Sequence, residues 1–203
     1  MHIDIDMFDT ISHAFQDYID TAERSIDALT PMLAEASQML VNTLLNDNRI
    51  FCIGSGTSML AAQLVVTNLV NRYDIERTSL PAIFIGHDIV TSSAIGADSG
   101  MLEIYSKPLR ALGSQDDVLM VFSSSGSDAS LVQAVRAAKE RQMGVIASCG
   151  ANGGDISALL AAEDIELRVP AIHPPRVTEM HMFIANCLCE LIDYTLFSTA
   201  DDD

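Results

Sequence analysis

Two short runs of glycine and hydroxyl-bearing residues have the chemistry of a phosphate site. The first run is GSGTS at 54–58 and the second is SSSGS at 123–127. Glycines let the backbone approach a ligand and turn its N–H groups inward, and the hydroxyls supply further donors. The first run lacks the third glycine of the dinucleotide fingerprint, and neither run continues into the Gly-Lys-Ser/Thr of a P-loop. The two runs together therefore predict a cradle for one phosphate monoester.

Each run joins a predicted strand to a predicted helix, whose first turn favours an anion. The apolar segments 50–53 and 118–122 are typical of buried strands, and 59–71 and 128–142 have the pattern of helices. Further strands are predicted at 81–85, 145–148 and 165–169, and further helices are predicted at 101–112 and 177–196. Strands joined by helices of this length form a parallel sheet with helices on both faces, and ligands bind beyond the carboxyl ends of the strands. The sequence therefore predicts a three-layer α/β/α fold with both runs at one sheet edge.

Residues 1–48 are predicted to form a helical hairpin in front of the α/β domain, which spans 49–203. Apolar residues recur at spacings of three and four along both halves of this segment. Thr30-Pro31 divides the halves, because a residue before proline avoids helical angles and proline suits the first turn of a helix. The apolar stripe needs a cover. Either the hairpin packs on its own domain, or it joins subunits through a helical bundle.

The composition excludes several classes of partner. The chain has 203 residues, the size of one domain, and its 11 Lys and Arg against 28 Asp and Glu give a net charge of −17. This balance excludes a chain-wide basic surface for nucleic acid, so a role on DNA would run through a protein partner. No apolar run approaches the ~20 residues that span a bilayer, and the N-terminus is acidic where a signal peptide is basic. We therefore expect a cytoplasmic protein that binds neither nucleic acid nor membrane.

The sequence resembles the SIS (sugar isomerase) domain family, in the branch of the phosphoheptose isomerases and the DnaA initiator-associating proteins. The resemblance covers nearly the whole chain and is carried by GSGTS and by the stretches 71–83, 110–127 and 176–197. It implies a five-stranded parallel sheet and a homotetramer built partly through the N-terminal helices, with sites at subunit boundaries. Taken with the two runs, it gives these predicted phosphosugar-binding residues: Ser55, Gly56, Thr57, Ser58, Ser123, Ser124, Ser125 and Asp128.

The departures from the family concern its zinc and proton-transfer groups. Phosphoheptose isomerases carry His and Glu after the first run and Gln and His on the last helix. The matching positions here are Leu64, Asn68, Thr178 and Asn186. Moving a carbonyl between C1 and C2 needs a base, and leucine neither binds a metal nor moves a proton. We therefore expect no metal or other cofactor, with zinc only if the chain is an isomerase after all.

Asp128 stands where the family has a serine that contacts the phosphate. As the residue before a predicted helix, it is a good N-cap. Its carboxylate would also repel a phosphate held by the same N–H groups. The alternatives are therefore a helix cap, a site that binds no phosphosugar, and a site for a neutral or cationic ligand.

Asp98, Glu179 and His181 remain as acid–base candidates. Glu179 and His181 match a Glu-x-His of the family's last helix, and they are either catalytic or a hydrogen-bonded structural pair. Asp98 matches a family acid in the loop after the second strand, where it is either a base or a loop hydrogen-bond acceptor. His87 and His173 lie in loops that can reach the predicted site, and the alternative for His173 is an ordinary surface position.

Three functions are compatible with these residues. The first is a regulatory protein without isomerase activity, which resembles the initiator-associating proteins and binds the replication initiator DnaA. The second is a phosphoheptose isomerase that converts sedoheptulose 7-phosphate to D-glycero-D-manno-heptose 7-phosphate. The third is a sensor of another phosphorylated sugar. Leu196 and Phe197 stand where the family's regulatory surface has a Leu-Phe pair, so they are predicted to bind the partner, and the alternative is that they only close the last helix.

Overall fold

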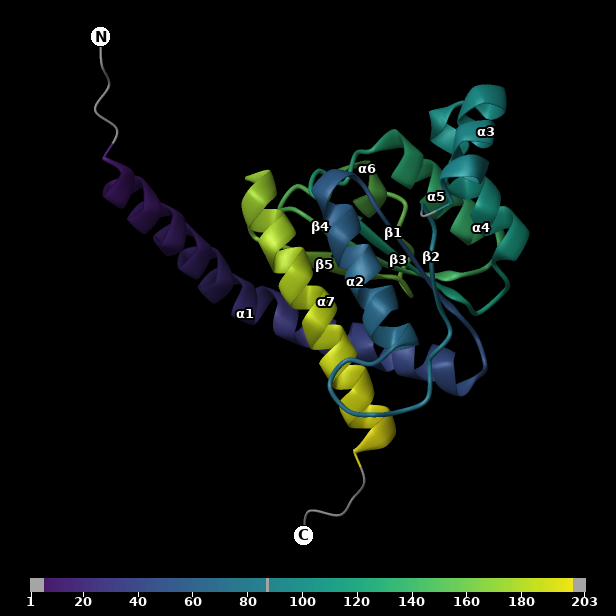
Figure 1. Ribbon diagram of the computed structural model, residues 1–203, viewed down its shortest axis with the longest axis horizontal. Helices are drawn as coiled ribbons and strands as arrows, with labels where there is room; N and C mark the ends of the chain where they lie inside the picture. The colour runs from purple at the N-terminus through teal and green to yellow at the C-terminus, as the bar shows by residue number, and fades with distance from the viewer. Residues whose placement is uncertain (1–5, 87, 199–203) are drawn as a thin grey trace.

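The computed structural model describes residues 6–86 and 88–198. Within these residues five parallel strands form one sheet in the order β2-β1-β3-β4-β5 (Figure 1). The strands are β1 Ile50–Gly54, β2 Ala82–Phe84, β3 Val118–Ser123, β4 Gly144–Cys149 and β5 Ile165–Arg168. The helices are α1 Met7–Leu45, α2 Met59–Val70, α3 Ile89–Ser99, α4 Ser106–Leu112, α5 Ala129–Glu140, α6 Gly154–Ser157 and α7 Pro174–Phe197, with short 3-10 helices η1 Gly56–Ser58 and η2 Met101–Glu103. The prediction of an α/β fold with a five-stranded parallel sheet is confirmed.

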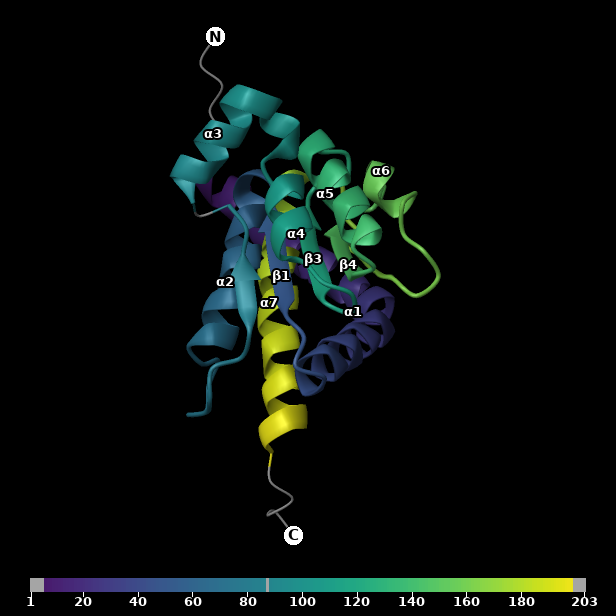
Figure 2. The ribbon, with the colours of Figure 1, turned by 90° about the vertical axis from the view of Figure 1, so that its right-hand side faces the viewer.

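Alternate residues of the strands face opposite layers of helices. In β1, Ile50 and Cys52 belong to the apolar cluster formed with α1, α2 and α7, whereas Phe51 and Ile53 belong to the cluster formed with α4 and α5. Figure 2 shows α2 and α7 on one side of the sheet and α4 and α5 on the other. All four of these side chains are fully buried. The first glycine-containing loop therefore follows a strand that is fixed on both faces.

The N-terminal segment is one helix of 39 residues, so the predicted hairpin is wrong. Pro31 lies inside α1, where it is exposed and the helix continues past it. A proline within a helix costs about 3 kcal/mol, whereas burying one leucine side chain contributes about 1.5–3 kcal/mol. Leu29, Leu33 and Leu40 lie on the same buried face on both sides of the proline. Burial of a continuous face therefore outweighs the local cost of Pro31.

The two halves of α1 have different surroundings. The C-terminal half packs on the domain through Leu29, Leu33 and Leu40. The N-terminal half extends away from the domain (Figure 1), and its Phe8 and Phe15 are 82% and 67% exposed. The helix therefore covers its own domain with one half and leaves an apolar stripe uncovered on the other.

The remaining differences from the predicted elements have local causes. Helix α3 was not predicted, and it has no buried residue, so it lacks the apolar stripe from which a helix is recognised. Helix α7 begins at Pro174 rather than at 177, because prolines suit the first turn, whose N–H groups have no partner in the helix. The predicted helix 101–112 is divided into η2 and α4, and the short helix α6 is additional. In the described part of the chain, no helix is both long and apolar enough to cross a membrane.

Candidate functional site

The two loops that carry GSGTS and SSSGS lie side by side at the carboxyl edge of the sheet. Strands β1 and β3 are neighbours, with Gly54 paired to Phe122. The Ser55 N–H, one residue later, donates to the Phe122 carbonyl at 3.2 Å. The parallel register therefore brings Ser55 and Ser123 together, although they are far apart in the sequence. This is the arrangement that the strand–loop–helix pattern predicts.

The centre of the two loops is occupied by the side chain of Asp128. Its Oδ2 atom accepts hydrogen bonds from the hydroxyls of Ser55 at 2.7 Å, Ser123 at 2.7 Å and Ser125 at 3.3 Å. Asp128 has the backbone position of the N-cap of α5, but its side chain makes no capping hydrogen bond. The capping role considered from the sequence is therefore wrong for the carboxylate, which binds the serines instead.

Gly126 fixes the shape of the second loop. Its φ is +70°, and its N–H donates to the Ser123 hydroxyl at 2.9 Å. A Cβ atom at this position would lie 2.0 Å from the Gly153 carbonyl oxygen. The Gly126 carbonyl also accepts from the Ile156 N–H at 2.9 Å. Only glycine fits here, because the loop before α6 packs directly on the backbone of the serine loop.

The predicted phosphosugar-binding residues differ in how far they face solvent. Gly56, Thr57 and Ser125 are exposed; Ser55, Ser124 and Asp128 are half-buried; Ser58 and Ser123 are buried. The Ser58 hydroxyl lies 3.2 Å from Nδ1 of His181, in the interior. Thr57 instead bonds across to α7, where its hydroxyl lies 3.1 Å from that of Thr178. Ser58 therefore makes its hydrogen bond inside the domain and is not available to a ligand. The exposed surface of the site is formed by Gly56, Thr57 and Ser125.

His181 lies behind the serine loops in the interior of the domain. The side chain has no exposed surface, and its ring packs edge-on against Phe122 with centroids 5.5 Å apart. Burial lowers the pKa of His181 to about 4. The imidazole is therefore neutral at pH 7 and bonded to Ser58, which is a structural role.

Glu179 and His181 are not hydrogen-bonded to each other, so the predicted pair is wrong. Residues two apart on a helix point in different directions. Glu179 Oε1 accepts from Arg176 Nη2 at 2.8 Å, and Arg176 also donates to the Ala14 carbonyl of α1 at 2.8 Å. Glu179 therefore orients an arginine that ties the first turns of α7 to α1.

The remaining acid–base candidates lie outside the serine loops. Asp98 is an exposed residue of α3 and not part of a loop, which corrects its predicted setting. His173 is exposed at the N-cap of α7, and its side chain makes no capping hydrogen bond. His87 lies outside the described residues.

The positions that match the family's zinc ligands lie on α2 and α7, and the residues at these positions do not fit a zinc ion. Leu64 packs against the apolar cluster of the α1, α2 and α7 side. Thr178 is bonded to Thr57. Asn68 and Asn186 offer neutral amides, which are poor zinc ligands. Within residues 6–86 and 88–198, no group of three or more His, Cys, Asp or Glu side chains is placed to hold a metal.

Leu196 and Phe197 lie in the last turn of α7 and are partly buried against the apolar core. The Phe197 ring lies 5.6 Å from the guanidinium carbon of Arg77. Arg77 donates to Asp193 at 2.7 Å and to the Asn68 carbonyl at 2.8 Å. No pattern in the sequence indicates this arrangement, because Arg77 lies in the segment between α2 and β2 and only the tertiary fold brings it to Asp193.

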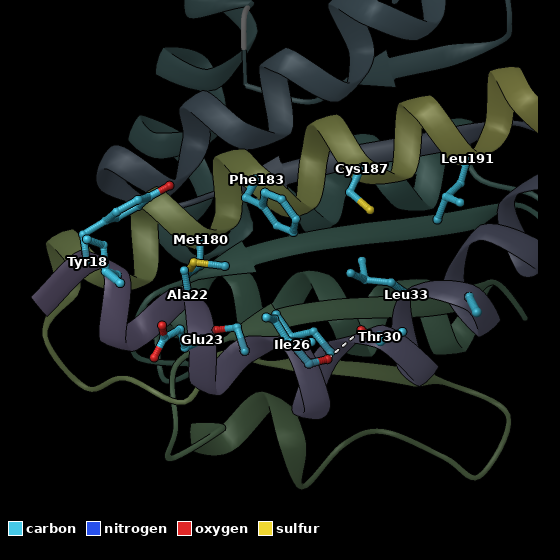
Figure 3. Close-up of a pocket in the computed structure, with 14 residues that line it drawn as sticks. Tyr18, Ala22, Glu23, Ile26, Thr30, Leu33, Met180, Phe183, Cys187 and Leu191 are labelled. Carbon is cyan, nitrogen blue, oxygen red and sulfur yellow. Dashed lines mark hydrogen bonds between the residues drawn. The ribbon is translucent and has the colours of Figure 1, made fainter. Parts of the chain in front are cut away.

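A second candidate surface is an apolar groove between α1 and α7, with a volume of about 610 Å³. Figure 3 shows Ala22, Ile26 and Leu33 of α1 on one side and Phe183 and Leu191 of α7 on the other. Ile26 is 63% exposed and Phe183 is 51% exposed. The groove is continuous with the uncovered stripe on the N-terminal half of α1. Its apolar lining is typical of a protein contact rather than of a carbohydrate site.

A comparison with protein families matches residues 14–150 to the SIS domain. The chain belongs to the SIS domain family. The resemblance read from the sequence motifs is therefore confirmed. This SIS domain chain is 43% identical to the DnaA initiator-associating protein DiaA of Citrobacter koseri over 196 residues, which are 97% of this chain and 100% of that protein. It is 42% identical to the DiaA protein of Salmonella paratyphi B, with the same coverage.

Solved SIS domain structures with other names share the fold. The phosphoheptose isomerase of Francisella tularensis has a TM-score of 0.91 at 35% identity, covering 93% of this chain and 99% of that chain. The phosphoheptose isomerase GmhA of Neisseria gonorrhoeae has a TM-score of 0.88 at 32% identity, covering 92% and 98%. One scaffold therefore carries an isomerase name in some relatives and an initiator-associating name in others. The side chains of the site must distinguish the two functions.

Proposed function

We propose that this SIS domain protein is a regulatory protein without isomerase activity, which associates with the replication initiator DnaA in the cytoplasm. The observation that carries the proposal is the loss of all four zinc and proton-transfer positions in an otherwise intact scaffold. Leu64, Asn68, Thr178 and Asn186 supply neither a metal ligand set nor a base. The similarity to the DiaA proteins over nearly the full length of both chains supports the same function.

The surviving ionisable groups do not replace the lost base. A general base must reach the proton that it removes, within about 3 Å or through one water. His181 is buried and bonded to Ser58, Glu179 is bonded to Arg176, and Asp98 is exposed on α3. These placements disfavour the isomerase alternative, and we propose that the chain uses neither zinc nor another cofactor. The remaining alternative, a sensor of another phosphosugar, is disfavoured by the carboxylate between the serines.

We further propose that the chain works as a homotetramer joined partly through α1. The uncovered half of α1 continues into the groove beside α7, and both present apolar side chains that a second copy of the same helices can cover. A tetramer would display the end of α7, with Leu196 and Phe197, several times. The net charge of −17 disfavours direct binding to nucleic acid, so an effect on DNA would run through the initiator.

Retention of DnaA by the purified protein tests the function. We expect immobilised protein to retain DnaA at low salt, and Leu196→Ala with Phe197→Ala to weaken retention at least about tenfold if the pair is a binding hot spot. Leu112→Ala is the matched control, because it removes a half-exposed leucine on α4, on the other side of the sheet. Failure of the wild-type protein to retain DnaA would contradict the proposal.

Turnover of sedoheptulose 7-phosphate tests the main alternative. We expect no conversion at high protein concentration, with or without added zinc, because none of Asp98, Glu179 and His181 is placed to act as the base. Conversion well above that of a no-protein control would favour the isomerase and contradict the proposal.

A further inference from the structure

The most unusual feature of the site is that its hydroxyl donors converge on a side chain of the protein itself. We infer that the Asp128 carboxylate occupies the place of a ligand phosphate and closes the cradle to phosphate monoesters. Asp128 is then the residue that determines specificity. This inference deepens the proposed function and rests on it only in that a regulatory protein needs no phosphosugar.

Three serine hydroxyls converge on the Oδ2 atom of Asp128. Two serine hydroxyls lie at 2.7 Å from this one atom and a third at 3.3 Å. Short contacts of several donors to a single anionic oxygen are the contacts that a phosphate oxygen makes in such a loop. A phosphate oxygen cannot share the position of Oδ2. It would also face a carboxylate, which has no proton to donate.

The serine hydroxyls have few protons to donate. A serine hydroxyl has one proton to donate. The hydroxyls of Ser55, Ser123 and Ser125 each direct it to Asp128. Ser123 also accepts from Gly126 N–H, and Ser125 accepts from Ser127 N–H at 3.2 Å. The three hydroxyls therefore have no proton left to donate to a ligand while they donate to Asp128.

The Asp128 carboxylate links the ends of β1 and β3. Ser55 belongs to the loop after β1, whereas Ser123 is the last residue of β3 and Ser125 lies in the loop that follows it. A phosphate bound between them would hold the loops together only while it is bound. Asp128 provides a permanent anionic link from the first residue position before α5. The positions of the three serines are therefore fixed by Asp128 and do not depend on a ligand, which suits a regulatory protein that binds no phosphosugar.

The test is binding of inorganic phosphate and of sedoheptulose 7-phosphate to wild-type protein and to Asp128→Ser, by thermal shift and calorimetry. We expect the wild-type Tm to stay unchanged up to about 10 mM ligand. Asp128→Ser removes the charge and frees the three hydroxyls, so we expect at least about tenfold tighter binding of both ligands and a Tm that rises with their concentration.

Asp155→Ser is the matched control, because it removes a charge from an exposed neighbouring aspartate at the start of α6 without emptying the cradle. We expect it to behave as the wild type. Circular dichroism reports folding, and if Asp128→Ser does not fold, Asp128→Asn provides the uncharged variant of similar size, with tighter phosphate binding than wild type expected. Equal binding by wild type and the folded Asp128 variant, or an equal gain in Asp155→Ser, would overturn the inference.

Retention of DnaA is measured separately on the wild-type protein, so the two proposals fail in different ways. A wild type that binds phosphosugar and still retains DnaA overturns the role of Asp128 alone. A wild type that binds no phosphosugar and does not retain DnaA overturns the regulatory function alone.

Discussion

Arg77 and Asp193 form an ion pair with Nε 2.7 Å from Oδ1, and their side chains are only 2% and 7% exposed. Arg77 lies between α2 and β2, so the pair joins this segment to the last turns of α7. Removing one partner leaves a buried charge without compensation, so we expect Arg77→Met to lower the free energy of unfolding by about 3–5 kcal/mol. Urea unfolding followed by circular dichroism measures this change.

The control for the ion pair is the double variant Arg77→Met with Asp193→Leu. Replacing both charges by apolar side chains removes the unpaired carboxylate, and such replacements are often neutral. We therefore expect the double variant to be more stable than Arg77→Met alone. The free energy of unfolding of Asp193→Leu is measured as well. If the loss in the double variant equals the sum of the losses in Arg77→Met and Asp193→Leu, the two residues are not coupled.

Pro31→Ala is expected to stabilise the protein. Proline in a helix interior lacks the N–H that would bond to the carbonyl of Asp27, and replacing it in this exposed position restores that bond. We expect a gain of about 1–3 kcal/mol in the free energy of unfolding. Thr30→Ala, at the neighbouring exposed position, should change it by less than about 1 kcal/mol. Unchanged or reduced stability of Pro31→Ala would indicate that the helix is broken at this residue.

Two glycines of the candidate site separate the cost of a positive φ from the cost of a steric clash, because both have a positive φ but only one leaves no room for a Cβ atom. Gly56 and Gly126 have φ values of +52° and +70°. An added Cβ would meet no atom within 4 Å at Gly56, but it would lie 2.0 Å from the Gly153 carbonyl oxygen at Gly126. We expect Gly56→Ala to cost about 1 kcal/mol and Gly126→Ala about 3 kcal/mol or more. Equal losses in thermal or urea unfolding would contradict the packing at Gly126.

His181 predicts a loss of stability in mild acid. Burial lowers the pKa of His181 to about 4, below its ordinary value of 6.5, so the unfolded chain binds more protons between these values. The free energy of unfolding that comes from keeping His181 neutral is fully present above pH 6.5. It is lost as the pH decreases from 6.5 toward 4. We expect wild type to lose up to about 3 kcal/mol more than His181→Gln over this range. Parallel pH profiles of urea unfolding for the two proteins would contradict the prediction.

The groove between α1 and α7 predicts the oligomeric state. Ile26 and Phe183 line it and are both more than half exposed in one chain. We expect the wild type to run as a tetramer in light scattering, and Ile26→Asp or Phe183→Asp to give smaller species, because a charge buried in an apolar contact is costly. Val90→Asp, at an exposed position of α3, is the control. A wild-type monomer would contradict the assembly proposed here.

The sequence predicted what depends on chain-wide patterns. The apolar runs before Gly54 and Ser123 are short and end at turn-forming residues, which is typical of buried strands, so the sheet and the meeting of the two loops could be foreseen. The break at Pro31 could not be judged correctly, because its local cost had to be weighed against tertiary burial. Helix α3 left no apolar stripe to detect.

The details of the site were less predictable because side-chain direction depends on tertiary packing. Asp128 follows the sequence rule for a helix cap, but its carboxylate meets Ser55, which only the sheet brings near. The hydrogen bond between Ser58 and His181 likewise joins two elements that are far apart in the chain. Residue types indicated a phosphate cradle, but only the fold shows that an aspartate fills it.

The length of α1 has a consequence for how the molecule melts. At the helical rise per residue, its 39 residues form a rod about 58 Å long, and only part of that rod is anchored in its own domain. In the proposed tetramer, a neighbouring copy that packs on the free part would also restrain the anchored part. Unfolding of the domain is then linked to dissociation, and the melting temperature rises with protein concentration. Dilution of the protein would then lower the melting temperature of the domain, although the contacts within each chain stay the same.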